Sequence, residues 1–185
     1  MEFEELVKAR RSMRAYRENT TISVEELKEI IRFALEAPSW KNSETGRYYV
    51  ASGKEQIARI SKAGLPEFNQ NNTKNAAALI VTAFESGRSG CDSEGKPVNE
   101  LGNEWGAYDL GMQNMLLCLK AKEAGYDSLI MGIRDEKALR REFNIPDSQH
   151  VAAVIALGKG AMEMKKPIRK EVDEVAVFIS KTSNF

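Results

Sequence analysis

The sequence predicts a single α+β domain over residues 1–185, a three-layer α/β/α sandwich with helices on both faces of a central sheet. Three observations support this fold class. The 185 residues, 42% of them apolar, are enough for one core and too few for two. Helical and strand-like segments alternate along the chain. The segment AAALIVTAF is apolar without interruption, which is typical of a strand covered on both faces.

In the first half of the chain, sequence patterns predict three helices and one strand. A short amphipathic helix is expected at 2–9. A capping box at Ser23 opens a second helix, which Pro38 ends. A strand is predicted at 47–52 and a short helix at 54–62. The polar, asparagine-rich segment 66–75 gives no helix or strand pattern, and it leads into the apolar strand that ends at Phe84.

The second half begins with a long irregular segment. Residues 85–103 contain four glycines and no periodicity, which indicates a functional loop, here a candidate lid. A helix at 104–124 is apolar almost all round and so is expected to be buried on all sides, partly by a second subunit. A strand at 128–133, a charged helix at 135–143 and a last core strand at 151–158 follow. The tail 165–185 comes after the complete core and is predicted to be an arm that packs on the partner.

Composition excludes several classes of function. Lys plus Arg and Asp plus Glu balance at 27 each, which argues against a nucleic-acid or membrane-surface binder. The two cysteines suit neither a disulfide framework nor a zinc site, and no signal peptide or membrane-spanning run is present, so a cytoplasmic protein is expected. The one histidine, His150, lies at the start of a strand and is interpreted as a structural or surface residue rather than a catalytic one.

Glycine motifs do not indicate a nucleotide-binding loop. Gly158-Lys159-Gly160 follows a strand, but Glu163 stands where a dinucleotide-binding motif needs its third glycine, and no helix is expected after it. No GxxxxGK[ST] motif occurs, so ATP or GTP chemistry of that kind is not supported.

Two basic clusters are candidate anion sites. Arg10, Arg11, Ser12 and Arg14 place three guanidinium groups and a hydroxyl within five residues, which suits a phosphate. The second cluster is Lys165, Lys166, Arg169 and Lys170. Each has a plainer interpretation, a solvated basic turn for the first and a solvated tail for the second.

Two further segments could contact a planar ligand. The turn Pro38-Ser39-Trp40-Lys41-Asn42 offers polar donors beside an indole ring, although Trp40 could equally be a core residue. Asn69 could pair with the edge of a heterocycle because its amide presents a donor and an acceptor together, or it could simply form a turn.

In this order, the motifs resemble the nitroreductase family of FMN-dependent enzymes. The resemblance covers essentially the whole chain, and the ordered succession of motifs is more specific than any one of them. The motifs are RRSMRAY, APSWKN, FNQNNTKNAAALIV, WGAYDLGMQNMLLCLKAKEAGYDS with the strand ending in MGI, and EFNIPDSQHVAAVIALGKG with the basic tail.

The resemblance implies a nitroreductase-like fold with a central mixed sheet and an intertwined homodimer, with FMN at the subunit interface. By motif, the family residues that bind the phosphate, ribityl chain and pyrimidine edge of FMN correspond here to Arg10, Arg11, Ser12 and Arg14. Lys166 and Arg169 correspond to the late basic residues that complete the phosphate clamp.

The remaining site residues also follow from the resemblance. Pro38, Ser39, Trp40 and Asn42 form the turn that reaches the flavin from the other subunit. Asn69 matches the amide that pairs with the pyrimidine edge, and Met131 and Gly132 fall where backbone groups approach the flavin N5 edge. No metal ligand is expected.

Two departures from the family pattern stand out. Asn42 is followed by Ser43-Glu44-Thr45-Gly46 where many members have x-Gln-Pro-Trp, which changes the flavin contact and the neighbouring pocket. Met131 stands where many members have Glu before the glycine near N5, a change that is tolerable if the contact is made by backbone.

The implied activity is an oxidoreductase that passes electrons from NADH or NADPH through FMN to nitro compounds, quinones or flavins by a ping-pong mechanism. The flavin carries the chemistry and Arg14 tunes it by favouring the reduced form, so no catalytic side chain is required. Three alternatives stay open: a specialised flavoenzyme (a dehalogenase or a flavin-fragmenting enzyme), a flavin-binding sensor or storage protein, and a dimeric module that holds another phosphorylated ligand.

Overall fold

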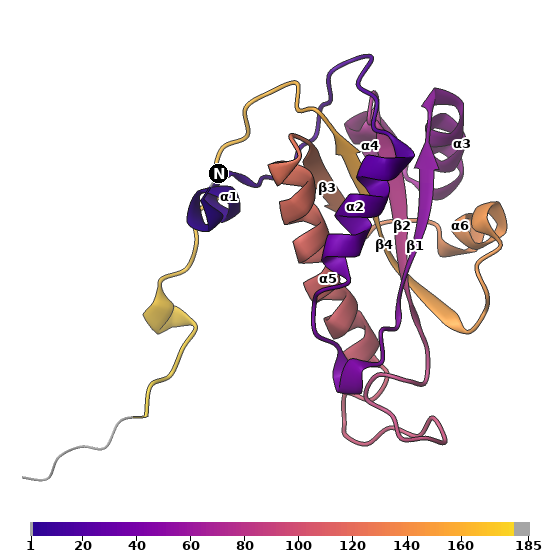
Figure 1. The fold of residues 1–185 in the computed structure, drawn as a ribbon, viewed down its shortest axis with the longest axis vertical. Coiled ribbons are helices and arrows are strands. Elements are labelled where there is room, and N and C mark those ends of the chain that lie inside the picture. Colours follow the sequence, from indigo (N-terminus) through magenta and orange to yellow (C-terminus); the bar gives the residue numbers. More distant parts are fainter. Residues whose placement is uncertain (1, 180–185) are drawn as a thin grey trace, which may run out of the picture.

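The computed structural model describes residues 2–179. Its central sheet has four strands in the order β1-β2-β4-β3. The α2 and α5 helices cover one face and the α3 and α6 helices the other, which confirms the three-layer arrangement (Figure 1). The strands are β1 (Gly46–Ser52), β2 (Ala78–Glu85), β3 (Asp127–Met131) and β4 (Gln149–Gly158).

The sheet is antiparallel throughout. The β2 strand pairs with β1 and with β4, and β3 pairs with β4 at the edge of the sheet. The expectation of a mixed sheet is therefore wrong for the four strands of the described chain. Among residues 2–179 the parallel pairing is an isolated bridge between Ser12 and Ser128, which lies on the free edge of β3.

The predicted helices are present, with ends shifted by a few residues. The capping box forms as expected, since Ser23 Oγ accepts from the Glu26 amide and the Glu26 carboxylate accepts from the Ser23 amide. The helices are α1 (Phe3–Ala9), α2 (Val24–Ala34), α3 (Lys54–Gly64), α4 (Glu67–Thr73), α5 (Glu104–Glu123) and α6 (Glu136–Phe143), with short 3₁₀ turns η1 (Trp40–Asn42) and η2 (Val172–Glu174).

The α4 helix was not predicted from the sequence. Its residues EFNQNNT have no amphipathic pattern, and asparagine is a poor helix former. Tertiary contacts hold it instead, because Asn69 and Thr73 are buried and the Thr73 hydroxyl approaches that of Ser61 on α3 at 3.3 Å. This helix places Asn69 beside the end of β3.

The uninterrupted apolar run of β2 is explained by two cores. Leu79 and Val81 point into the core under α3 and α6, whereas Ala78 and Ile80 point into the core under α2 and α5. Successive side chains of a strand face opposite sides, so a central strand between two helical layers must be apolar at every position.

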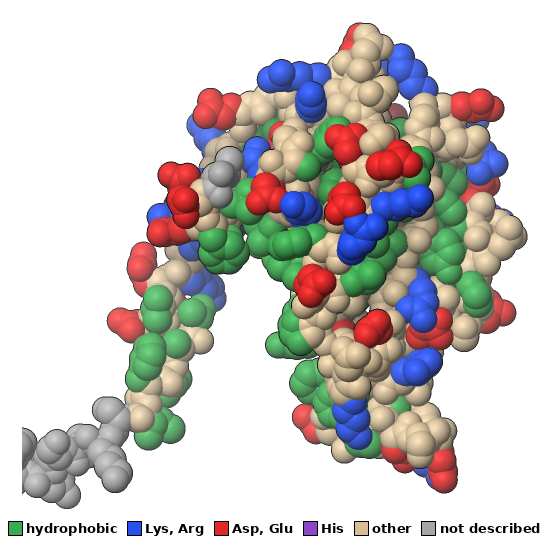
Figure 2. Space-filling model, in the orientation of Figure 1, with side chains coloured by type: hydrophobic (Ala, Val, Ile, Leu, Met, Phe, Trp, Pro, Cys, Tyr) green, Lys and Arg blue, Asp and Glu red, His purple; other side chains and the backbone are tan. Residues whose placement is uncertain are grey.

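Within this chain the long α5 helix is buried on one side only, and the burial of its other side by a second subunit stays a prediction. Leu110, Leu117 and Cys118 face the core, whereas Tyr108 is 60% exposed and Met115 is also exposed. Figure 2 shows hydrophobic side chains on the face of the domain that carries α5 and along the tail. An apolar stripe of this kind is typical of an interaction surface.

Residues 85–103 form an irregular loop, as expected, closed by a bridge between Cys91 and Pro97. Residues 161–171 contain no helix, so none opens directly after Gly160 as a dinucleotide-binding motif would require. The tail leaves the domain next to α1 (Figure 1), and Ile168 is 98% and Val177 91% exposed, so the described chain does not cover them. The rest of the predicted arm, 180–185, lies outside the described residues. No helix in 2–179 is long and apolar enough to cross a membrane.

Candidate functional site

The early basic segment runs beside the edge strand β3 and the end of β4. The Met13 amide donates to the Ser128 carbonyl at 2.9 Å, and the Arg17 amide donates to the Lys159 carbonyl at 2.8 Å. The Ala161 amide in turn donates to the Ala15 carbonyl at 2.9 Å. These bonds bring the start of the C-terminal tail and the early arginines to the same end of the molecule.

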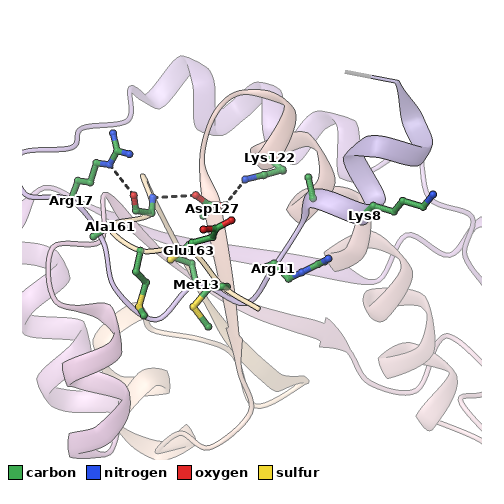
Figure 3. A pocket seen from close by; sticks show the side chains of 12 residues that line it. Lys8, Arg11, Met13, Arg17, Lys122, Asp127, Ala161 and Glu163 are labelled. Atoms are coloured by element: carbon green, nitrogen blue, oxygen red, sulfur yellow. Dashed lines mark hydrogen bonds and ion pairs between the residues drawn. The ribbon is translucent and has the colours of Figure 1, made fainter. Parts of the chain in front are cut away.

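A pocket of about 600 Å³ lies between these two segments (Figure 3). Its charged lining consists of four cations and two carboxylates: Lys8, Arg11, Arg17, Lys122, Asp127 and Glu163. Lys122 Nζ pairs with Asp127 Oδ1 at 2.7 Å, and the Gly160 amide donates to Asp127 Oδ2 at 3.1 Å, so the Asp127 charge is neutralised. The other charged groups of the lining are three cations and one carboxylate, so the pocket carries a net positive charge that suits an anion.

Extended backbone separates the early cluster into two faces. Arg11 and Met13 line the pocket, whereas Arg10, Ser12 and Arg14 do not. Because alternate residues of an extended segment point to opposite sides, these three lie on the other face of the segment. Arg11 is therefore the one residue of the predicted early cluster that lines this pocket.

The face with Arg10 carries an unsatisfied donor. Arg10 Nε is buried and has no hydrogen-bond partner in residues 2–179, while the Arg14 side chain is exposed and donates to the Ser12 carbonyl at 3.3 Å. A buried N–H without an acceptor is costly unless a ligand or water provides one. This geometry fits a bound phosphate oxygen.

The two ends of β3 connect the predicted site residues. Ser12 pairs with Ser128 near the start of the strand, and Asn69 Nδ2 donates to the Ile133 carbonyl at 3.1 Å just after its end. The Asn69 side chain thus lies beside Met131 and Gly132. From Ser128 to Gly132 the strand rises by roughly 13 Å, which is comparable with the reach of FMN from ring to phosphate. A Cβ placed on Gly132 would meet no heavy atom within 4 Å, so the backbone there is accessible.

The turn of Pro38, Ser39, Trp40 and Asn42 lies near the opposite end of α5. The Trp40 amide donates to Asp109 Oδ2 at 2.9 Å, and the Trp40 ring packs against Trp105 with centroids 4.9 Å apart. Lys122, in the pocket of Arg11, is 13 residues further along the helix, or about 20 Å. Within one chain, this turn and the early arginines therefore lie too far apart to contact the same ligand.

The turn has a constrained backbone. Lys41, Asn42 and Glu44 all have positive φ, at 48°, 53° and 48°. Such conformations are costly for residues other than glycine and persist when the surroundings impose them, often at functional sites. Here Ser39 Oγ accepts from the Glu44 amide at 3.1 Å, and Asn42 Nδ2 donates to Glu44 Oε1 at 2.8 Å.

Lys166 and Arg169 do not meet the early cluster in this chain. Both are exposed, and the Arg169 guanidinium approaches the carbonyl of Pro167, two residues away, at 3.5 Å. His150 is exposed on β4 with its ring 5.3 Å from that of Phe84, and within residues 2–179 no cluster of possible metal ligands is found.

Comparison with known proteins settles the family. The model of the nitroreductase family matches residues 7–159, which include the early basic segment, the turn at 38–42 and all four strands. The chain belongs to the nitroreductase family. The match ends before Lys166 and Arg169, so the tail lies outside it.

Relatives of the nitroreductase family match at full length. The Bacillus subtilis protein YdgI, provisionally named an NAD(P)H nitroreductase, is 27% identical, with 95% of this chain and 96% of that protein covered. A nitroreductase-like protein from Exiguobacterium sibiricum, solved in complex with FMN, has a TM-score of 0.85 at 22% identity, covering 97% of this chain and 98% of the other. A gut-bacterial enone reductase has a TM-score of 0.84 at 19% identity, covering 97% and 98%. Both structures show the same fold.

Sequence reasoning missed several residues around the site of this nitroreductase-family chain. Asp109 is 2% exposed and accepts hydrogen bonds from the Trp40 amide and, at 2.7 Å, from Ser89 Oγ. The signal was available, because Asp109 is the one carboxylate among the buried residues of α5. Arg17, Lys122 and Asp127 could not be found in this way, since only the fold brings them together.

Replacing Asp109 with asparagine is expected to destabilise the protein by about 1 kcal/mol, because a neutral acceptor makes weaker hydrogen bonds than a carboxylate. In a protein of this size the melting temperature should fall by roughly 2–4 °C. Thermal unfolding measures this change. The fluorescence of Trp40 and Trp105 should shift as well, since both tryptophans of the chain lie in this unit. An unchanged melting temperature and spectrum would show that Asp109 does not hold the turn.

Cys118 is expected to be unreactive in the native protein. Burial raises the pKa of its thiol, although a hydrogen bond with Ser128 and the nearby Arg10 charge lower it in part. A thiol that stays protonated and buried is a poor nucleophile. In a Cys91→Ser variant, Ellman's reagent at pH 8 should react with Cys118 only after unfolding. Rapid reaction of the native variant would contradict the buried position.

Proposed function

We propose that this chain is an FMN-dependent oxidoreductase that uses NADH or NADPH to reduce small oxidised acceptors. The observation that carries the proposal is the row of site residues along the edge of β3. The proposed phosphate donors lie at one end, where Arg10 Nε is buried without an acceptor in the described chain, and the Asn69 amide lies at the other, beside the accessible backbone of Gly132.

In this proposal, Arg10, Ser12 and Arg14 would hold the phosphate, the ribityl chain and the pyrimidine edge of FMN, and Asn69 would pair with the ring. Arg11, which the sequence placed in the same group, faces the other pocket instead. When bound, FMN would supply the two-electron transfer chemistry between the nicotinamide and the acceptor. Met131 is a buried core residue, so its backbone rather than its side chain faces the ring. The absence of a glutamate at this position is then tolerable.

A second copy of the chain would complete the site. The turn of Pro38, Ser39, Trp40 and Asn42 cannot reach the early arginines of its own chain, but two copies packed through the exposed stripe of α5 in antiparallel orientation would bring them together. The arm 165–185 would then pack on the partner, covering its exposed apolar residues and bringing Lys166 and Arg169 to a phosphate.

The protein's own residues would bind and tune FMN rather than transfer protons. Arg14, exposed in the single chain and placed next to Ser12, would lie against the negative pyrimidine edge and favour the reduced form. His150 is exposed with its ring beside Phe84 and takes no part.

The loop 85–103 would cover the open face of the ring as a lid. Ser89, at its base, is buried and hydrogen-bonded to Asp109, whereas residues 92–98 at its tip are exposed. A single domain leaves no separate nicotinamide site, so donor and acceptor would use the same face in turn. Parallel double-reciprocal plots would support this ping-pong order, and intersecting plots would contradict it.

The proposal is tested by the absorption spectrum of the purified protein. It should be yellow, NADH or NADPH should bleach it under anaerobic conditions, and a nitroarene, a quinone or an enone should restore the colour. A yellow protein that neither donor bleaches would instead indicate a flavin sensor or storage protein. A colourless protein that FMN does not reconstitute would indicate another phosphorylated ligand.

A further inference from the structure

A second pocket, of about 470 Å³, lies between the turn at 39–44 and the loop 85–103. Its lining includes Trp40, Lys41, Asn42, Arg88, Cys91 and Asp92. Trp40 and Asn42 also belong to the turn that is proposed to contact the partner's FMN. A ligand in this pocket would therefore lie next to the reacting ring, on the side of the lid.

The two walls of this pocket are joined by hydrogen bonds. Ser43 Oγ, on the turn, lies 2.8 Å from Ser89 Oγ, at the base of the loop. Ser89 Oγ donates to Asp109 Oδ2 at 2.7 Å, and the same oxygen accepts from the Trp40 amide at 2.9 Å. The buried carboxylate of α5 thus fixes both walls, and the pocket is a built feature rather than a gap under a loop.

The polar lining favours an anion. Lys41 and Arg88 form no ion pair within residues 2–179, and the buried Trp40 Nε1 has no acceptor there. Asp92 is the one carboxylate of the lining, and its Oδ1 accepts from the amides of Glu94 and Lys96 at 2.9 Å each. The lining therefore holds two cations without ion pairs and a single carboxylate, which backbone amides already engage.

We propose that this pocket binds an anionic group on a reactant of the flavin. The group is either the carboxylate of an aromatic acid that acts as electron acceptor or the 2′-phosphate of NADPH. Arg88 and Lys41 supply the charge, and the Trp40 ring and Cys91 offer apolar surface to the rest of the ligand. That the bound molecule reacts with the flavin rests on the proposed function. That the bound molecule is an anion is inferred from the lining of the pocket alone.

Binding is tested on the FMN-loaded protein with two pairs of probes, in each of which one member carries an anionic group that the other lacks. Benzoate is compared with benzamide, and NADP⁺ with NAD⁺, by following the fluorescence of Trp40 and Trp105, which form one wall of the pocket and its backing. Wild-type protein should bind at least one of the two anionic probes, benzoate or NADP⁺, more tightly than its counterpart that lacks the anionic group. Arg88→Gln and Lys41→Gln should each reduce that preference roughly tenfold, the value of one charge-assisted hydrogen bond.

The matched control is Lys96→Gln. Lys96 lies on the same loop and pairs with Glu94 at 2.6 Å, but it does not line the pocket, so its replacement should leave both preferences unchanged. If neither anionic probe is preferred, or if Lys96→Gln acts as strongly as Arg88→Gln, the proposal is wrong.

Turnover identifies which reactant carries the anion. The ratio of kcat/KM for 4-nitrobenzoate over 4-nitrobenzamide should fall in Arg88→Gln if the acceptor is bound here. The ratio for NADPH over NADH should fall if the donor is. If the protein prefers an anionic probe but reduces no acceptor, the pocket binds anions and the proposed function is wrong. If the protein is active but Arg88→Gln changes neither ratio, the assignment of this pocket to an anionic reactant is wrong.

Discussion

Arg10→Ala is expected to weaken FMN binding by roughly tenfold to a hundredfold, the loss of one charge-assisted hydrogen bond or slightly more. Arg10 is the early arginine whose Nε is buried without an acceptor in the described chain, so a phosphate oxygen would satisfy it. Equilibrium titration of the apoprotein with FMN, followed by flavin fluorescence, measures the dissociation constant.

Arg17→Ala is the control that locates the phosphate. Arg17 lines the pocket of Arg11, on the other face of the basic segment, where its Nε donates to the Gly160 carbonyl at 2.9 Å. If FMN lies along β3, Arg17→Ala should change the FMN affinity by less than Arg10→Ala does. The reverse order would place the phosphate in that pocket and overturn the assignment of Arg10.

Arg169→Ala extends the same measurement to the tail. It should weaken FMN binding as Arg10→Ala does, while gel filtration shows an unchanged dimer. Unchanged FMN affinity in both variants would mean that the phosphate clamp has been placed wrongly.

Arg14→Gln is expected to make the reduction potential of bound FMN more negative by roughly 30–60 mV, since one charge-assisted hydrogen bond to the reduced form is lost. The lower end applies if Arg14 remains as exposed as it is in the single chain, because solvent screens its charge. Anaerobic titration against a reference dye measures the potential.

A second arginine shows whether the shift is local. Arg141 is exposed on α6 and belongs to none of the proposed FMN contacts, so Arg141→Gln removes the same charge from outside the site and should shift the potential by much less than Arg14→Gln does. Equal shifts in the two variants would indicate a general effect of net charge. No shift in Arg14→Gln would contradict a contact between Arg14 and the pyrimidine edge.

Local patterns predicted much of the fold. The capping box at Ser23 located α2, and the apolar run ending at Phe84 identified the central strand between two cores. The α4 helix was missed because tertiary contacts, not propensity, hold its asparagines. The mixed sheet was wrong because it came from the family resemblance rather than from the strand patterns, and periodicity does not reveal strand direction.

The site was predictable as a set of residues but not as an arrangement. The sequence nominated Asn69 and Gly132, which the fold brings together at the end of β3. It could not show that Arg10 and Arg11 face opposite sides, because that depends on extended backbone beside β3. Nor could it show that Asp109 fixes both the turn of Trp40 and the loop of Ser89, since these contacts join residues far apart in the chain.

The central claim is that each FMN site takes the early arginines from one chain and the turn at 38–42 from the other. Mixed dimers test it most directly. An Arg10→Ala chain and a chain with Ser39→Ala and Asn42→Ala, each unable to retain FMN alone, are co-expressed with different tags, and the mixed dimer is isolated. A shared site predicts one intact and one doubly altered site, hence one tightly held FMN per dimer and about half the wild-type activity per dimer. A mixed dimer that holds no FMN tightly and is no more active than its parents would show that each site is built from a single chain.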